Sequence, residues 1–349
     1  MESESQALLH PDVPLVDAHV HMNAAGLYDS IRESMDAAGC ARINFITTPR
    51  KDGGNDNEVL LQYKERDPDR FYAFGALDYR GPDGEALEPL TMTGAARKAL
   101  AERLGRQPAR LKSLGFDGIK MIESKPASRR FLPFPLDSDV YAPFFAAADK
   151  ERFPLLWHVG DPEDFWNPER IHSAARARGW LYNQPGDPSL ETVRREAENV
   201  LARHPNLIVI FAHFYFLGNK LPRARKMFQA FPCVRFDVTP GGQMYKFFND
   251  QREEARRFFI EFQDGLIYGS DLSSSRDTKR WNAQGAANIW RSMRAYFGSE
   301  GVMPDNFPGA RFLAPGETIR GLNLPKETLA KLLHENFERV AGKAPANLP

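Results

Sequence analysis

The fold prediction begins from Leu207-Ile-Val-Ile-Phe-Ala-His213, six apolar residues followed by a histidine. A continuous apolar run of this length is typical of a strand that is buried on both faces, as in a parallel sheet covered by helices. The histidine comes where the strand ends. In barrels of parallel strands, this carboxyl end is the side on which active sites are built.

Similar apolar runs recur along the chain, and helix-like segments separate them. The eight expected strands cover residues 15–20, 42–46, 71–77, 118–121, 154–158, 207–212, 234–237 and 266–270. Amphipathic helix patterns occupy, among others, residues 28–38, 139–151, 189–203 and 250–263. Eight strand–helix units over 349 residues predict a single α/β domain, a (β/α)₈ TIM barrel spanning residues 1–349. A doubly wound open sheet is the structural alternative.

Two segments exceed ordinary connection length. Residues 160–186 follow the fifth expected strand, and residues 272–324 follow the eighth. Long connections in a barrel usually carry the site or cover it. We therefore expect both to belong to the same domain as the barrel.

The composition favours a small-molecule substrate. Lys+Arg and Asp+Glu both number 46, and no basic stripe is visible, so nucleic acid is not an expected partner. The two cysteines, Cys40 and Cys233, lie outside any zinc or disulfide spacing. No apolar run approaches the roughly 20 residues that cross a bilayer, and the first residues lack a signal-peptide pattern. We expect a cytoplasmic protein that does not bind membranes, and a homodimer remains open.

Polar residues capable of binding a metal follow several of the expected strands. His19 and His21 are two positions apart in a strand, so their side chains should point to the same face. His158, His213 and Asp271 each end another apolar run. Burying several imidazoles beside a carboxylate is costly unless a cation compensates them. Such nitrogen and oxygen ligands suit Zn²⁺, with Mn²⁺, Fe²⁺ or Co²⁺ as substitutes.

The order of these residues resembles the amidohydrolase superfamily. The closest branch is the amidohydrolase-2 group, which includes the aminocarboxymuconate-semialdehyde decarboxylases. The resemblance spans nearly the whole chain and is carried by four motifs: Asp17-Ala-His-Val-His21, Ala202-Arg-His-Pro-Asn-Leu-Ile-Val-Ile-Phe-Ala-His213, Tyr268-Gly-Ser-Asp271 and Asn336-Phe-Glu-Arg-Val-Ala-Gly342. It implies metal ligands at His19, His21, His158 and Asp271, with His213 as the acid/base or a further ligand.

Two segments depart from the family pattern. The family often has glycines after the histidine of the sixth strand, whereas this chain has Phe214-Tyr-Phe-Leu-Gly218. The family often has an aromatic residue and a proline after the aspartate of the eighth strand, whereas here Leu272-Ser-Ser-Ser275 follows. Both changes fall beside the expected site. The resemblance therefore supports the assignment of the metal ligands more strongly than the assignment of a substrate.

Lys120 closes the apolar run of the fourth expected strand and has two interpretations. In binuclear members of the superfamily, a lysine near this point is carbamylated and bridges two metals. A desolvated lysine with a lowered pKa is capable of that chemistry. The alternative is an ordinary ammonium that pairs with a carboxylate or contacts the substrate, and on that basis we expect one metal ion.

Other residues are weaker candidates for substrate contact. Arg50 follows the second strand and has the bidentate fork that grips a carboxylate, although a solvated arginine is the simpler explanation. Asp161, just after His158, is placed to orient an imidazole. Four aromatic residues flank the site in sequence and are candidates for lining a pocket, with packing as the alternative for each: Trp157, Trp166, Phe214 and Tyr215.

The predicted activity is metal-dependent hydrolysis of an amide, lactone or ester in a small molecule, with water activated by the metal. Asp271 would take the proton of that water, and His213 would orient the water or stabilise the developing oxyanion. The main alternative uses the same residues for non-oxidative decarboxylation of an aromatic or muconate-type acid. A non-catalytic binding barrel is a third possibility.

Overall fold

The computed structural model describes residues 9–89, 91–274 and 280–349. Residues 275–279, within the predicted connection 272–324, lie outside these ranges, as do residues 1–8 and 90. Within these ranges, the strands form one parallel sheet with the order β8-β7-β6-β5-β4-β3-β2-β1-β9. They are β1 (Leu15–His21), β2 (Cys40–Ile46), β3 (Phe71–Gly75), β4 (Gly118–Ser124), β5 (Leu155–Val159), β6 (Val209–Phe211), β7 (Val234–Asp237), β8 (Leu266–Ile267) and β9 (Leu272–Ser273).

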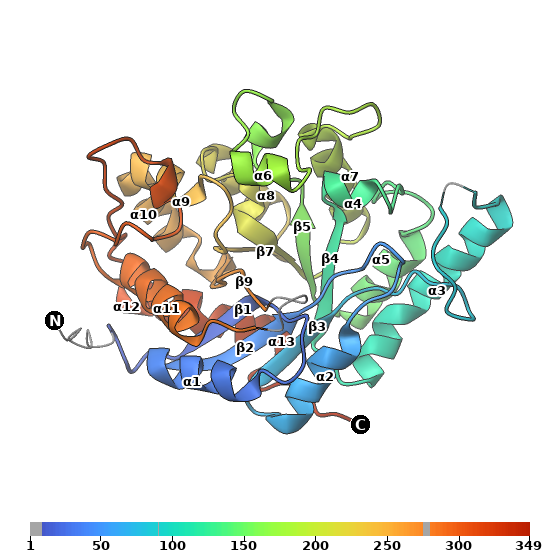
Figure 1. The fold of residues 1–349 in the computed structure, drawn as a ribbon, viewed down its shortest axis with the longest axis horizontal. Helices are drawn as coiled ribbons and strands as arrows, with labels where there is room; N and C mark the ends of the chain where they lie inside the picture. Colours follow the sequence, from blue (N-terminus) through green and yellow to red (C-terminus); the bar gives the residue numbers. More distant parts are fainter. Residues whose placement is uncertain (1–8, 90, 275–279) are drawn as a thin grey trace.

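The sheet curls into a barrel because its last segment returns to its first strand (Figure 1). β8 pairs with β7, and β9, which follows β8 after four intervening residues, pairs with β1. Between them, Ala18 N donates a hydrogen bond of 3.1 Å to Tyr268 O, and Asp271 N donates one of 3.0 Å to His19 O. The predicted (β/α) barrel is confirmed. The predicted strand 266–270 is too long, because only Leu266–Ile267 pairs with β7. Strand pairing resumes in β9, after Asp271, whose φ is +59°.

Helices surround the sheet and occupy most of the connections (Figure 1). They are α1 (Tyr28–Ala38), α2 (Asn57–Arg66), α3 (Gly94–Ser113), α4 (Pro126–Arg129), α5 (Ala142–Glu151), α6 (Ser173–Ala177), α7 (Leu190–Arg203), α8 (Leu221–Ala230), α9 (Met244–Asp250), α10 (Arg252–Glu261), α11 (Ala283–Gly298), α12 (Lys326–Ala330) and α13 (Asn336–Ala341). α1 has its predicted bounds. α7 begins after Ser189, whose hydroxyl accepts from Thr192 N and so caps the helix.

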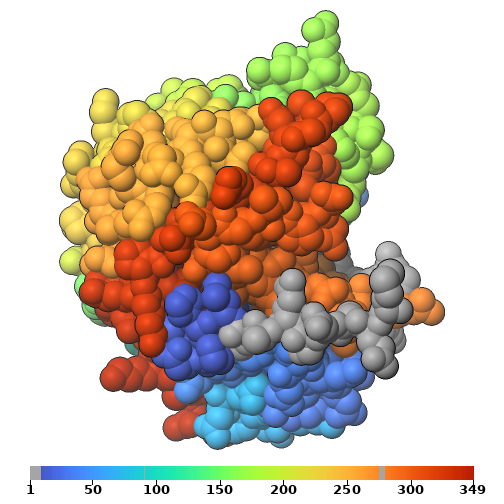
Figure 2. All heavy atoms as spheres, turned by 90° about the vertical axis from the view of Figure 1, so that its left-hand side faces the viewer, coloured from blue at the N-terminus to red at the C-terminus, as the bar shows by residue number. Residues whose placement is uncertain are grey.

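The two long connections carry short helices of their own. The segment after β5 contains a 3₁₀ turn at Glu163–Trp166 and then α6. Figure 2 shows this part of the chain, in green, standing out from the body of the molecule. α11 follows β9 and packs against α1. Within the described ranges, no helix combines the length and the apolar character that crossing a bilayer requires.

The barrel interior is a small apolar layer distinct from the main core between sheet and helices. Its members alternate along the strands with residues of the main core: Val16, Ala18, Ile46, Tyr72, Phe74, Leu156, Ile210, Ala212, Ile267 and Phe337. This alternation is the period-two geometry of strands. It fixes which side chains of each strand point into the barrel.

The amino end of the barrel is closed by the C-terminal segment. Phe337 on α13 packs edge-on against Tyr72, with ring centroids 5.1 Å apart, and also contacts Phe74. The Asn336 side-chain amide donates to Leu266 O at 2.7 Å, and Tyr72 Oη donates to Gly342 O at 2.8 Å. The motif at 336–342 therefore acts as a plug, which leaves the carboxyl end of the barrel as the open side.

Candidate metal centre and active site

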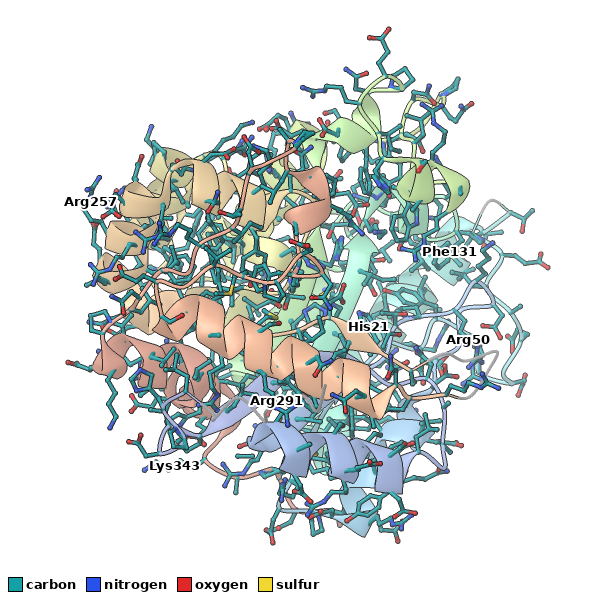
Figure 3. All side chains as sticks on the ribbon, turned by 60° about the vertical axis from the view of Figure 1, so that its left-hand side comes forward. His21, Arg50, Phe131, Arg257, Arg291 and Lys343 are labelled. Carbon is teal, nitrogen blue, oxygen red and sulfur yellow. The ribbon has the colours of Figure 1, made fainter. Side chains whose placement is uncertain are left out.

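A bulge in β1 brings two histidines to the open end of the barrel. Between Asp17 and Val20, β1 advances three residues while β2 advances two. Ala18 belongs to the inner layer and Val20 to the main core. The extra residue lets His19 and His21 face the barrel interior although the preceding Ala18 faces it too; their ring centroids are 5.3 Å apart. His21 is labelled near the centre of Figure 3.

The hydrogen bonds of His19 determine its tautomer. Its Nδ1 lies 2.7 Å from Asp237 Oδ2 and 3.2 Å from Thr239 Oγ1. Because a carboxylate only accepts, Nδ1 carries the proton and Nε2 keeps its lone pair. That Nε2 lies 3.6 Å from Asp271 Oδ1, and His21 Nε2 lies 3.3 Å from the same oxygen. Two imidazole nitrogens thus converge on one carboxylate oxygen.

His213 projects from an unusual turn after β6. Residues 213–216 all have φ between +51° and +57°, although none is glycine. This left-handed conformation costs about 1–2 kcal/mol per residue. The His213 Nδ1 atom lies 3.1 Å from Pro240 O and 3.3 Å from Thr239 O, so Nδ1 donates and Nε2 is the free nitrogen. The His213 ring is 5.4 Å from that of His19 and 4.8 Å from that of His158.

Two buried side chains hold this turn in place. Asp237 Oδ1 accepts from His213 N at 2.7 Å. Arg194, fully buried on α7, donates to Phe216 O at 3.2 Å and to Tyr215 O at 3.4 Å. The strained backbone is therefore hydrogen-bonded on both sides.

His158, at the end of β5, faces Asp161. Its Nε2 lies 3.2 Å from Asp161 Oδ1, which confirms that Asp161 orients an imidazole. The same oxygen accepts from Lys125 Nζ at 2.9 Å, and the second carboxylate oxygen accepts from Tyr182 Oη. Because Nε2 donates to Asp161, Nδ1 is the nitrogen of His158 left with a lone pair.

These donors fit a divalent metal ion. Ligands 2.0–2.2 Å from a tetrahedral ion are separated by about 3.4 Å, the edge of the tetrahedron. The separations of 3.3 Å and 3.6 Å at Asp271 match this spacing. One donor atom each from His19, His213 and Asp271 lie within 4.8 Å of one another. This compact set contains two predicted ligands, His19 and Asp271, together with His213, the further candidate. His21 contacts the same Asp271 oxygen, and the His158 ring packs against that of His213.

Burial prepares the ligands for binding. It lowers the pKa of His19 and His21, and it lowers the pKa of His158 to about 3, so these imidazoles are neutral near pH 7. Burial alone would raise the pKa of Asp271, but the hydrogen bond from His21 and the neighbouring His213 and His19 hold it below the usual range. Neutral imidazoles and an ionised carboxylate are the forms that bind a cation.

Lys120 reaches the same centre from the middle of β4. The strand extends to Ser124, so the prediction that Lys120 closes it is wrong. The Lys120 ammonium is buried, and its Nζ lies 3.2 Å from His19 Nε2. Burial lowers the pKa of Lys120 to about 8. Lys120 is therefore a cation directly beside the candidate metal position.

Two of the residues predicted to contact the substrate, Trp157 and Tyr215, are buried in the main core. Trp157 is buried between Phe145 and Phe211 in the main core. Tyr215 is likewise fully buried and packs 4.3 Å from Phe211. These positions favour packing for both residues. Trp157 belongs to the main core, as do Leu155 and Val159, the other odd-numbered residues of β5.

Two further candidates, Trp166 and Arg50, are held by neighbours at the open side. Trp166 packs 5.0 Å from Tyr182, and its Nε1 donates to Pro188 O. The Arg50 guanidinium donates to Asp56 at 2.7 Å and to Asp52 at 3.3 Å. Its fork is thus occupied by two carboxylates of its own loop.

Sequence reasoning missed Asp237 and Thr239. Asp237 ends β7 just as the other site residues end their strands, and that position was the available signal. Thr239 has no such signal, since it follows the strand. Asp17 was noted only as part of a motif. It is buried and accepts from Trp290 Nε1 at 2.6 Å and from the backbone N atoms of His19 and Ser270, which fixes the bulge.

The barrel and its histidine–carboxylate cluster define an enzyme of the metal-dependent barrel class. A family model described as amidohydrolase matches residues 14–342. The chain belongs to the amidohydrolase family, and the resemblance noted from its motifs is confirmed. A sequence comparison with curated proteins gave no match.

Solved structures agree with the fold at low sequence identity. An uncharacterised TIM-barrel protein from Bordetella bronchiseptica has a TM-score of 0.54 and 12% identity, covering 94% of this chain and 98% of its own. 2,6-Dihydroxybenzoate decarboxylase from Rhizobium has a TM-score of 0.50 and 16% identity, covering 94% and 98%. 5-Carboxyvanillate decarboxylase from Novosphingobium aromaticivorans, complexed with manganese, has 0.50 and 15%, covering 97% and 99%. At this identity the likeness establishes the fold.

Proposed function

We propose that the protein hydrolyses an amide, ester or lactone bond in a small molecule with the help of one divalent metal ion. The observation that carries the proposal is the position of Asp271. Its side chain is 38% exposed at the open end of the barrel and lies within 3.6 Å of Nε2 atoms from both His19 and His21. A carboxylate placed beside the metal donors and open to solvent is suited to act as a general base toward water.

His19, His21, His158 and Asp271 would hold the ion, with His213 as a further candidate. A bound divalent ion would lower the pKa of water to about 7 and polarise the scissile carbonyl. Asp271 would accept a proton from the attacking water and return it to the leaving group. His213, whose Nδ1 donates to backbone carbonyls, would accept a hydrogen bond from that water through Nε2.

Zinc is the proposed ion. Three or more imidazoles with one carboxylate at these separations suit Zn²⁺, while the same donors accept Mn²⁺, Fe²⁺ or Co²⁺. Elemental analysis of protein purified without a metal-binding tag tests this assignment. A bound iron or manganese ion would replace zinc without changing the ligands, and a metal-free protein that takes up none of these ions would contradict the site.

The substrate test uses a panel of amides, esters and lactones with wild-type protein and Asp271→Asn. We expect turnover by the wild type and a loss of about 10²–10⁴-fold in kcat for the variant. Asp250→Asn is the control, because it removes a carboxylate that pairs with Lys246 on the outside of α9. Equal rates for wild type and Asp271→Asn would contradict the role of Asp271 as base.

Decarboxylation of an aromatic carboxylic acid is the second candidate. The likeness to 2,6-dihydroxybenzoate and 5-carboxyvanillate decarboxylases supports it. In that reaction, protonated His213 would give its Nε2 proton to the carbon from which carbon dioxide departs. Carbon dioxide release from hydroxybenzoates, with no hydrolysis in the panel above, would favour this candidate over hydrolysis.

A further inference from the structure

A second feature of the open side is a basic pocket formed by the loops after β2, β4 and β5. Its volume is about 490 Å³. Four of its ten lining residues are cations and none is a carboxylate; the cations are Lys51, Lys125, Arg130 and Arg178. Ile122, Phe131 and Trp180 supply apolar and aromatic walls. Figure 3 labels Phe131 and Arg50, the neighbour of Lys51, on the same side of the molecule.

Two of these cations are neutralised by neighbours. Arg130 forms two hydrogen bonds with Asp187, at 2.9 Å and 3.0 Å, and two more with backbone carbonyls. Lys125 is bound to Asp161, but Asp161 also accepts from His158 and Tyr182. One carboxylate therefore serves three donors.

The other two cations have no carboxylate partner among the residues that the structure describes. Lys51 is exposed, and in the described ranges it has no hydrogen bond or ion pair with a carboxylate. Arg178 is also exposed, and its guanidinium lies 5.1 Å from the centroid of Trp180, again without a carboxylate partner in those ranges. The potential of the pocket is therefore positive, which attracts an anion.

Asp161 Oδ1 contacts both a cation of the pocket and a histidine of the candidate metal centre. Asp161 Oδ1 lies 2.9 Å from Lys125 Nζ and 3.2 Å from His158 Nε2. Lys125, which lines the pocket, is thus linked through Asp161 to His158, a predicted metal ligand. A molecule held at both places would carry an anionic group remote from its reacting bond.

We propose that this pocket binds a carboxylate of the substrate at a distance from the bond that reacts at the metal, with Lys51 and Arg178 as the recognising cations. The proposal rests on the proposed function, because it assumes that the metal holds the other end of the same molecule. It narrows the substrate class to small acids with a second polar group. Hydrocarbon between the two ends would lie against Ile122 and Phe131.

The test compares linear dicarboxylates from succinate to suberate with monocarboxylates of the same chain length. Isothermal titration calorimetry on metal-loaded protein gives the dissociation constants. We expect one dicarboxylate to bind about tenfold more tightly than its matched monocarboxylate, since partly exposed charge pairs are individually weak. The preference should shrink at high ionic strength because the charges are screened.

The decisive variant is Lys51→Gln/Arg178→Gln. Both residues are exposed, so the fold should be retained, which thermal unfolding checks. We expect the dicarboxylate preference to disappear in this variant. The control is Arg106→Gln/Arg110→Gln, which removes the same charge from an exposed face of α3 elsewhere. A preference that survives in Lys51→Gln/Arg178→Gln, or that is absent from the wild type, would overturn the proposal.

Inorganic phosphate separates the pocket from the proposed function. In metal-free protein, phosphate binding that is weakened by Lys51→Gln/Arg178→Gln and unaffected by the control would support the anion pocket on its own. If that result came with a protein that binds no metal, the proposed function would fall while the anion pocket stood. Phosphate binding that is equal in all variants would overturn the pocket.

Discussion

Asp237→Asn tests the central inference about how the metal ligands are oriented. The Asp237 carboxylate accepts three hydrogen bonds: Oδ2 from His19 Nδ1 at 2.7 Å, and Oδ1 from the backbone N atoms of His213 and Thr239 at 2.7 Å and 3.1 Å. An asparagine at this place has one acceptor oxygen and one donor nitrogen. An asparagine therefore accepts either from His19 Nδ1 or from the two backbone N–H groups, but not from both.

Either orientation of the amide disturbs the site. If its oxygen faces the two backbone N–H groups, its NH₂ group faces His19 Nδ1, which must then lose its proton. The proton moves to Nε2, the nitrogen that faces Asp271 at 3.6 Å, and the lone pair for the metal is lost. If the amide is reversed, the backbone donors of His213 and Thr239 are left without an acceptor, at a cost of about 1–3 kcal/mol each.

We expect Asp237→Asn to bind metal about 10–100-fold more weakly, which is about 1.4–2.7 kcal/mol. Competition with a chromogenic chelator measures the affinity, and long-range ¹H–¹⁵N spectra of the imidazoles report the tautomer of His19. The control is Asp117→Asn, because Asp117 is also a buried carboxylate and accepts from Lys64 Nζ and two backbone N atoms far from the site. The control should lose stability and keep its metal affinity. Unchanged affinity in Asp237→Asn would refute the argument.

Three further predictions concern the ligands, the plug and pH. His19→Ala and Asp271→Ala should each lose bound metal, whereas His213→Asn should keep it while kcat falls about 10²–10⁴-fold; elemental analysis and rates on the same preparation check this. Phe337→Ala should reduce the free energy of unfolding, measured by urea denaturation, by about 3–5 kcal/mol, because it leaves a cavity in the apolar layer inside the barrel. The metal-free protein should lose stability as the pH falls from 6.5 toward 3, since His158, with a folded pKa of about 3, stays neutral while the unfolded chain takes up a proton. The expected slope is about 1.4 kcal/mol per pH unit for that residue, and a flat profile in urea titrations would contradict it.

Much of the fold was predictable because the strands of a parallel barrel are buried on both faces. Such strands must be apolar, and the polar residue that ends one is visible against that background, as His158, His213 and Asp271 are. The same period-two rule could have excluded Trp157. It precedes His158, so it points to the opposite face, toward Phe145 on α5.

What was not predictable depends on contacts between distant parts of the chain. The bulge in β1 is specified by Asp17, whose partners Ser270 and Trp290 are more than 250 residues away. With strict alternation, the side chain of His19 would point to the face opposite that of Ala18. The bulge puts both side chains on the same side, and no local sequence pattern predicts it. Arg50 is similar, because its loop places Asp52 and Asp56 around the guanidinium, and only the folded loop shows that the fork is occupied.

The turn after β6 has a backbone conformation that glycine adopts easily, although this chain has Phe214-Tyr-Phe there. Glycine adopts a positive φ without steric cost, and residues 213–216 require it throughout. Here the cost is offset by burial. Phe214 packs against Phe248 with ring centroids 5.0 Å apart, and Arg194 binds the carbonyl oxygens of the turn. The aromatic side chain of Phe214 therefore anchors the turn in the core.

A glycine is still required on the facing loop. A Cβ atom at Gly241 would lie 2.7 Å from the Cβ atom of His213, closer than real Cβ atoms approach. The imidazole of His213 is thus confined between the turn that carries it and the loop after β7, with Phe216 stacked on its face at 5.2 Å. A ring confined in this way presents Nε2 in one direction, toward His19 and His158. The left-handed backbone of residues 213–216 costs free energy, and the same backbone conformation orients the imidazole of His213, the acid/base candidate, toward the site.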